Sequence, residues 1–66
     1  MDFEIVFERE EDGRWIAAID SLPGVMAYGA SQQEAKSRVE ALALRVIADR
    51  IELEQSAPDQ VRFAVA

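Results

Sequence analysis

The sequence contains neither cysteine nor histidine. Without cysteine it can form no disulfide framework and no thiolate zinc site, and without histidine it lacks the commonest metal ligand and the commonest general base. Long apolar runs are also missing: none approaches the ~20 residues of a membrane span, and the acid-rich first segment is unlike a secretory signal. We therefore expect a cytoplasmic protein without cofactor, metal or catalytic activity.

Basic residues are scarce, with 7 Lys and Arg against 13 Asp and Glu and a net charge of −6. Such a chain repels phosphate backbones, so we expect no direct nucleic-acid binding. Six of the acids fall within the first twelve residues, beside Arg9 alone. This segment is either a solvated face or a surface for a basic partner. The candidate partner-binding residues are Glu8, Glu10, Glu11, Asp12 and Tyr28, the last of which could equally be a core aromatic.

At 66 residues and 7.4 kDa, the chain has room for one domain, spanning residues 1–66. Apolar residues at positions 3, 5 and 7 alternate with acidic residues at positions 2, 4 and 8, which predicts a strand with one covered face. A glycine turn at Gly13 and an extended run over 14–19 complete a hairpin. A three-residue loop would place Trp15, Ala17 and Ile19 on the face of the first strand's aromatic residues, and we predict that register.

Further elements follow from turn and capping patterns. The Leu22-Pro23-Gly24 segment predicts a tight turn before a third strand over 25–28. Ser31 and Glu34 form a capping box, so a helix should start there and run to about Ile51. Its core stripe should comprise Ala35, Val39, Leu42, Ala43 and Val46. Alternation over 61–65 predicts a last strand, parallel to the first.

The predicted fold is therefore α+β, in the order β-β-β-α-β, with sheet order 3-2-1-4 and one helix on one face. Two apolar sets remain outside this arrangement, on the back of the sheet and on the flank of the helix. We predict that the chain forms a homodimer or tetramer through one or both sets. The predicted interface residues are Val6, Ile16, Ala18, Leu44, Ile47 and Ile51.

A catalytic alternative is a magnesium-dependent nuclease built on Glu4, Glu8 and Asp20. Strand alternation and turn chemistry explain these three carboxylates without a metal, so we rank a nuclease below the two binding functions described next.

The spacing of several turns resembles the N-terminal domain of HicB antitoxins. The resemblance covers roughly residues 3–51. It is carried by the structural turn residues Gly13, Leu22, Pro23 and Gly24, with Trp15-Ile16-Ala17, Tyr28-Gly29 and the Ser31–Ala35 helix start.

The resemblance implies a truncated ribonuclease-H-like fold without nuclease activity. It also implies a function: binding and occluding a HicA-like toxin, a small basic mRNA-cleaving protein of a type II toxin-antitoxin system. Many HicB antitoxins continue into a DNA-binding domain, whereas this sequence stops at Ala66, so we expect no C-terminal DNA-binding domain here. The alternative is a solitary homo-oligomeric HicB-like protein with a regulatory or structural role and no toxin.

Overall fold

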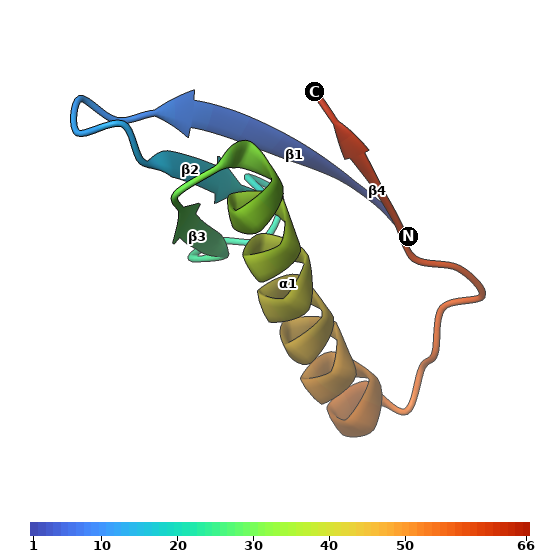
Figure 1. Cartoon of the computed structure of the whole chain (residues 1–66). Helices are drawn as coiled ribbons and strands as arrows, with labels where there is room; N and C mark the ends of the chain where they lie inside the picture. The colour runs from blue at the N-terminus through green and yellow to red at the C-terminus, as the bar shows by residue number, and fades with distance from the viewer.

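A computed structural model describes all 66 residues as one sheet and one helix (Figure 1). Strands β1 and β2 form a hairpin, β3 continues the sheet, and β4 returns after helix α1 to lie parallel to β1, which gives the order β3-β2-β1-β4. The α+β class and the 3-2-1-4 order are confirmed. The elements are β1 Asp2–Arg9, β2 Trp15–Ala18, β3 Met26–Gly29, α1 Gln32–Glu54 and β4 Arg62–Val65.

The first hairpin has the register predicted from burial. Phe7 lies opposite Ala17 and Arg9 opposite Trp15. The next pair is therefore Glu10 and Arg14, which leaves a loop of three residues, 11–13, between the strands. The loop closes where the N–H of Glu10 donates to the carbonyl of Arg14 at 2.8 Å, and Gly13 takes a φ of 90° that favours glycine. This register separates a helix-side face of odd-numbered residues in β1 and β2 from a back face of even-numbered residues.

The turn before β3 forms a small folded unit. The N–H of Val25 donates to the carbonyl of Leu22 at 3.0 Å across Pro23 and Gly24, and Gly24 has a φ of 82°. These are the features of a turn with proline in its second position and glycine in its third. Leu22 and Val25 are buried, so the turn also supplies core side chains that strand and helix periodicity did not predict.

Helix α1 begins at the predicted cap and runs three residues beyond the predicted end. The N–H of Glu34 donates to Ser31 Oγ at 3.1 Å, and the Glu34 side chain reaches back to accept from the N–H of Ala30. The helix ends at Gln55, which takes a left-handed φ of 52° and donates its N–H to the carbonyl of Ile51. The apolar pattern ends near Ile51 and no glycine marks the cap, which explains why the predicted boundary is too early.

The core lies between the odd-numbered face of the sheet and one stripe of α1. Three helix residues predicted for the core are buried, and Leu42 and Val46 pack against them while half-buried. Ile47 is 2% exposed, so it is a buried residue of the single chain. The sequence predicts Ile47 on an uncovered flank of the helix, and this prediction is wrong because the residue faces the sheet. The buried apolar residues are Ile5, Ala17, Ile19, Leu22, Val25, Ala35, Val39, Ala43 and Ile47.

The helix does not cover the whole sheet. Its close approaches are to β3 and β2, while β4 stands clear of it (Figure 1). Val65 on β4 lies opposite Ile5 on the helix-side face of the sheet, yet it is 52% exposed. The last turns of α1 extend beyond the sheet, where Leu53 is exposed, and the molecule is elongated, 42 Å in its longest dimension and 16 Å in its shortest. No other element of the chain covers either region.

Candidate functional site

The back face of the sheet, away from α1, carries apolar side chains that nothing in the chain covers. The register aligns Val6, Ala18 and Met26 in one row across three strands. A second row aligns Glu8, Ile16 and Tyr28. Val6, Met26 and Tyr28 are 40%, 52% and 41% exposed. We call this surface the open face; it comprises Val6, Ile16, Ala18, Met26 and Tyr28.

Carboxylates border the open face along β1. Glu4 and Glu8 stand two residues on either side of Val6, so their side chains share its face, and both are exposed. The two cations nearest in register are already paired, since Arg62 Nε lies 3.0 Å from Asp2 and Arg14 Nε lies 2.7 Å from Asp12. Glu4 and Glu8 form no ion pair. The open face is therefore apolar at its centre and acidic along one side.

Asp12, Arg14 and Tyr28 form a cluster at the hairpin end of the open face. The Arg14 guanidinium stands 4.6 Å from the centre of the Tyr28 ring, within reach of a cation–π interaction. The backbone N–H of Arg14, helped by its side chain, donates to the Asp12 carboxylate and lowers its pKa below the ordinary value of 3.8. Tyr28 is thus an exposed aromatic on a surface, and the core alternative for it is wrong.

The remaining acidic candidates lie in and beside the hairpin loop. Glu11 and Asp12 are exposed in the loop, and Glu10 is half-buried at its base. Glu8 is exposed two residue pairs further from the loop than Glu10, opposite Ile16. The structure therefore places Glu8 in the same row as Tyr28 and links Asp12 to Tyr28 through Arg14, whereas the other two acids lie in or beside the loop.

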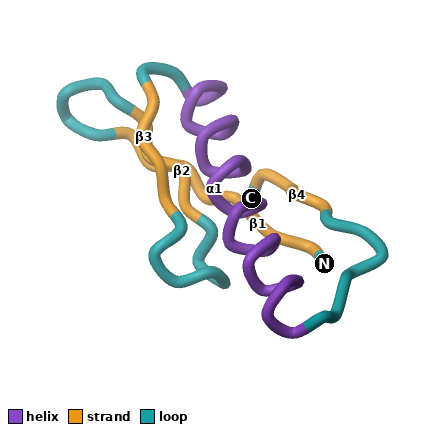
Figure 2. The backbone as a smooth tube through the Cα atoms, turned by 90° about the horizontal axis from the view of Figure 1, so that it is seen from below, coloured by secondary structure: helices purple, strands orange, loops and turns teal.

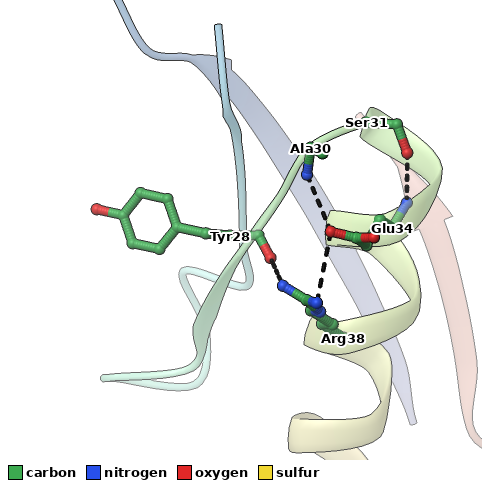
Figure 3. A network of polar contacts seen from close by, with 5 residues as sticks. All are labelled: Tyr28, Ala30, Ser31, Glu34 and Arg38. Carbon is green, nitrogen blue, oxygen red and sulfur yellow. Dashed lines mark hydrogen bonds and ion pairs between the residues drawn. The ribbon is translucent and has the colours of Figure 1, made fainter. Parts of the chain in front are cut away.

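The free edge of β3 is partly closed by the helix. Arg38 donates from Nη1 to the carbonyl of Tyr28 at 3.0 Å, and its Nη2 lies 3.5 Å from Glu34 (Figure 3). Figure 3 shows the Tyr28 ring pointing away from this network. Because an exposed strand edge is a template for pairing with another strand, this contact discourages strand addition at β3. Association through the face of the sheet is favoured over association through this edge.

The predicted helix interface divides between buried and exposed residues. Leu44 is 47% exposed, Ile51 is half-buried, and Ile47 belongs to the interior. A shallow hollow of about 160 Å³ lies beside the first turns of the helix. It is lined by Phe7, Gln32, Gln33, Lys36 and Val65, so it sits between α1 and the uncovered part of β1 and β4.

Sequence reasoning missed Met26 on the open face, although the signal was present. Met26 and Tyr28 stand two residues apart on one strand, so an outward Tyr28 requires an outward Met26. No group of three or more histidine, cysteine, aspartate or glutamate side chains converges as a metal site would require. No helix of the chain has both the length and the apolarity needed to span a membrane.

Comparison with known proteins returned no match among protein-family models, curated proteins or solved structures.

Proposed function

We propose that this chain is a protein-binding module that occludes a small basic RNA-cleaving protein, the role of the HicB-like antitoxins that its turn spacing resembles. The observation that carries the proposal is the open face, an exposed apolar surface with unpaired carboxylates along one side. Large exposed apolar side chains gathered on one face mark interaction surfaces, and charge of one sign beside them selects a partner of the opposite sign.

The open face suits a basic protein better than a nucleic acid. Its apolar centre offers nothing to a phosphate backbone, and Glu4 and Glu8 would repel one. A protein surface with lysine or arginine around an apolar patch would bury Met26 and Val6 while pairing both carboxylates. The module itself performs no chemistry in this proposal; it acts by covering its partner's RNA-binding surface.

The partner to test is a small basic protein encoded next to this chain in its host. Expressed alone it should arrest growth and cleave RNA, and coexpression of this chain should restore both growth and intact RNA. A neighbouring protein that stays toxic in the presence of this chain would contradict the proposal. With purified proteins, added salt should slow association, because screening weakens electrostatic steering.

Charge reversal on the open face gives the sharper measurement. The double variant Glu4→Lys, Glu8→Lys should slow association with the basic partner by roughly tenfold or more, since steering raises association rates by 10 to 1,000-fold. The matched control Glu54→Lys, Asp59→Lys makes the same change in net charge at exposed positions at the end of α1 and in the loop that follows it. Equal slowing by both variants would show an effect of net charge alone and would remove the open face from the site.

A second candidate function is self-association without a toxin partner. The exposed apolar side chains of Leu44, Leu53 and Val65 favour self-association, because they lie outside the open face.

A further inference from the structure

One helix is too narrow to cover one face of this sheet. Four strands about 4.8 Å apart span roughly 14 to 19 Å, whereas a helix with its side chains is about 10 Å across. Two helices side by side would cover such a face, and the chain contains only one. Because α1 lies over β3 and β2, the helix-side surface of β4 and the adjoining part of β1 are left uncovered.

The uncovered half of the sheet is apolar. Phe3 and Phe63 lie opposite each other in the parallel register, with ring centres 5.8 Å apart, and both remain half-buried. Val65 lies opposite Ile5, and Phe7 lines the hollow beside it. We call this surface the vacant half-face; it comprises Phe3, Phe7, Phe63 and Val65. It lies on the opposite side of the sheet from the open face.

The outer surface of α1, turned away from its own sheet, carries a narrow apolar stripe bordered by charged side chains. Ala41, Leu44, Ala48 and Ile51 are spaced 3, 4 and 3 residues apart, which places them on one stripe of the helix. The first three are exposed and Ile51 is half-buried. A helix in contact with one sheet only would be expected to carry polar residues there. Small residues on such a stripe let another surface approach the helix closely.

The exposed area and the radius of gyration of this chain are both larger than those of a compact monomer of the same length. A compact monomer of 7.4 kDa should expose about 4,200 Å². This chain exposes 4685 Å² and buries only 10 of 66 residues. Its radius of gyration is 12.5 Å, against about 10.8 Å for a compact domain of this length. A dimer that buries about 800 Å² per copy, a standard amount, would cover more than this excess.

We propose that a second copy of this chain covers the vacant half-face with the outer surface of its α1. In a two-fold dimer the arrangement is reciprocal, so each helix lies between its own β2 and β3 and the partner's β1 and β4. The two helices then form one layer between two sheets. Each sheet has its helix-side surface fully covered, while both open faces stay exposed and available to the basic partner.

Charge favours a second copy on these surfaces and opposes it on the open face. The outer stripe of α1 is bordered by two cations and two acids, so the formal charges beside it sum to zero. These residues are Arg38, Arg45, Asp49 and Glu52. Lys36, at the edge of the vacant half-face, is paired with Glu40. Two open faces brought together would instead confront Glu4 and Glu8 with their own copies, and like charges in an interface are costly.

Sedimentation equilibrium of the purified chain at micromolar concentrations tests the proposal. The expected species has twice the 7.4 kDa mass. Ala48→Glu on the outer stripe and Val65→Glu on the vacant half-face should each raise the dimer dissociation constant on the order of 100-fold, because each buries an unpaired charge. Ala48 is exposed and helical, so this variant should fold as the unmodified chain does. Circular dichroism verifies that.

The matched control is Ala64→Glu, one residue before Val65 and on the opposite side of the sheet. It adds the same charge to the same strand and should leave the dimer intact. A short thiol cross-linker should also join Ala48→Cys in one copy to Val65→Cys in the other, since the chain has no cysteine of its own.

A monomeric unmodified chain would overturn the proposal. So would a dimer that tolerates both Ala48→Glu and Val65→Glu, or one that is lost only on Ala64→Glu, which would assign the interface to the open face. The proposal goes beyond the partner-binding function and does not depend on it. Ala48→Glu should still restore growth against the basic partner, so failure of either proposal is distinguishable from failure of the other.

Discussion

At the scale of single residues, Gly29 has the least freedom to change. A Cβ built on Gly29 would lie 2.9 Å from the carbonyl carbon of Glu34 and would also clash with the backbone N of Ala35. Both atoms belong to the first turn of α1, so β3 can approach the helix only where no side chain intervenes. Gly24 differs, because its surroundings are open and only its φ of 82° favours glycine.

We therefore expect Gly29→Ala to lower the free energy of unfolding by about 3 kcal/mol or more, the upper range for overpacking. Gly24→Ala should cost about 1 kcal/mol, the penalty of a left-handed backbone for a residue with a Cβ. Urea denaturation of both variants measures the difference. Similar losses in the two variants would show that β3 and α1 separate easily.

A second prediction at this scale concerns the carboxyl of Asp12. Its pKa is lowered, first by the backbone N–H of Arg14 and then by the Arg14 side chain. Arg14→Ala keeps the backbone donor, so the pKa of Asp12 should rise only part of the way toward 3.8. Because folding lowers the pKa of Asp12, its carboxylate stabilises the fold above pH 3.8, and this contribution is lost as the pH falls through the pKa of Asp12 in the folded state. Titration by NMR reads the pKa directly, and a full return to 3.8 would assign the effect to the guanidinium.

At the scale of elements, α1 is one helix in two environments. From Ala35 to Ile47 its inner stripe is buried, and beyond that the same stripe continues past the sheet to Leu53, which is 84% exposed. The helix continues because its residues are good helix formers and no glycine or proline interrupts them before Gln55. The overhang is therefore an effect of local propensity, while burial stops where the sheet ends.

The contrast between the two parts of α1 can be measured by truncating one side chain in each. Ile47→Ala should lower the free energy of unfolding by about 2 to 5 kcal/mol, because it removes buried methyl groups and leaves a cavity. Leu53→Ala should change it by less than about 0.5 kcal/mol, as for an exposed position. Equal effects in thermal unfolding would show that the end of the helix is covered in solution.

At the scale of the whole molecule, the open face and the vacant half-face stand on opposite sides of one sheet. Figure 2 shows the four strands with the single helix α1, and β3 and β4 lie at opposite edges of the sheet. So few buried residues provide little hydrophobic stabilisation for a domain of this size, and association is one way to increase it.

If copies associate when folded, the melting temperature should rise with protein concentration, since binding to the folded state alone stabilises it by mass action. Calorimetry between about 5 and 500 μM should show an upward shift of several degrees for the unmodified chain, by the usual relation of free energy to melting temperature. Ala48→Glu should abolish the concentration dependence. A melting temperature independent of concentration in the unmodified chain would mean that the folded monomer is the stable species.

Local patterns in the sequence determined the order of elements, the hairpin register, the turn at Pro23 and the capped start of α1. Each of these depends on residues close together in the chain, through alternation, a glycine φ or a side chain that reaches a nearby N–H. The parallel pairing of the last strand followed as well, because the handedness of such crossovers leaves few arrangements.

Only the tertiary structure decided which apolar residues are covered. Ile47 and Leu44 are both apolar helix residues three positions apart, yet one is buried and the other is 47% exposed. The difference depends on the angle and position at which α1 crosses the sheet, and these result from the summed packing of many side chains. For the same reason the sequence could not show that Val65 lies beyond the helix, or that the sheet keeps half of its helix-side face free.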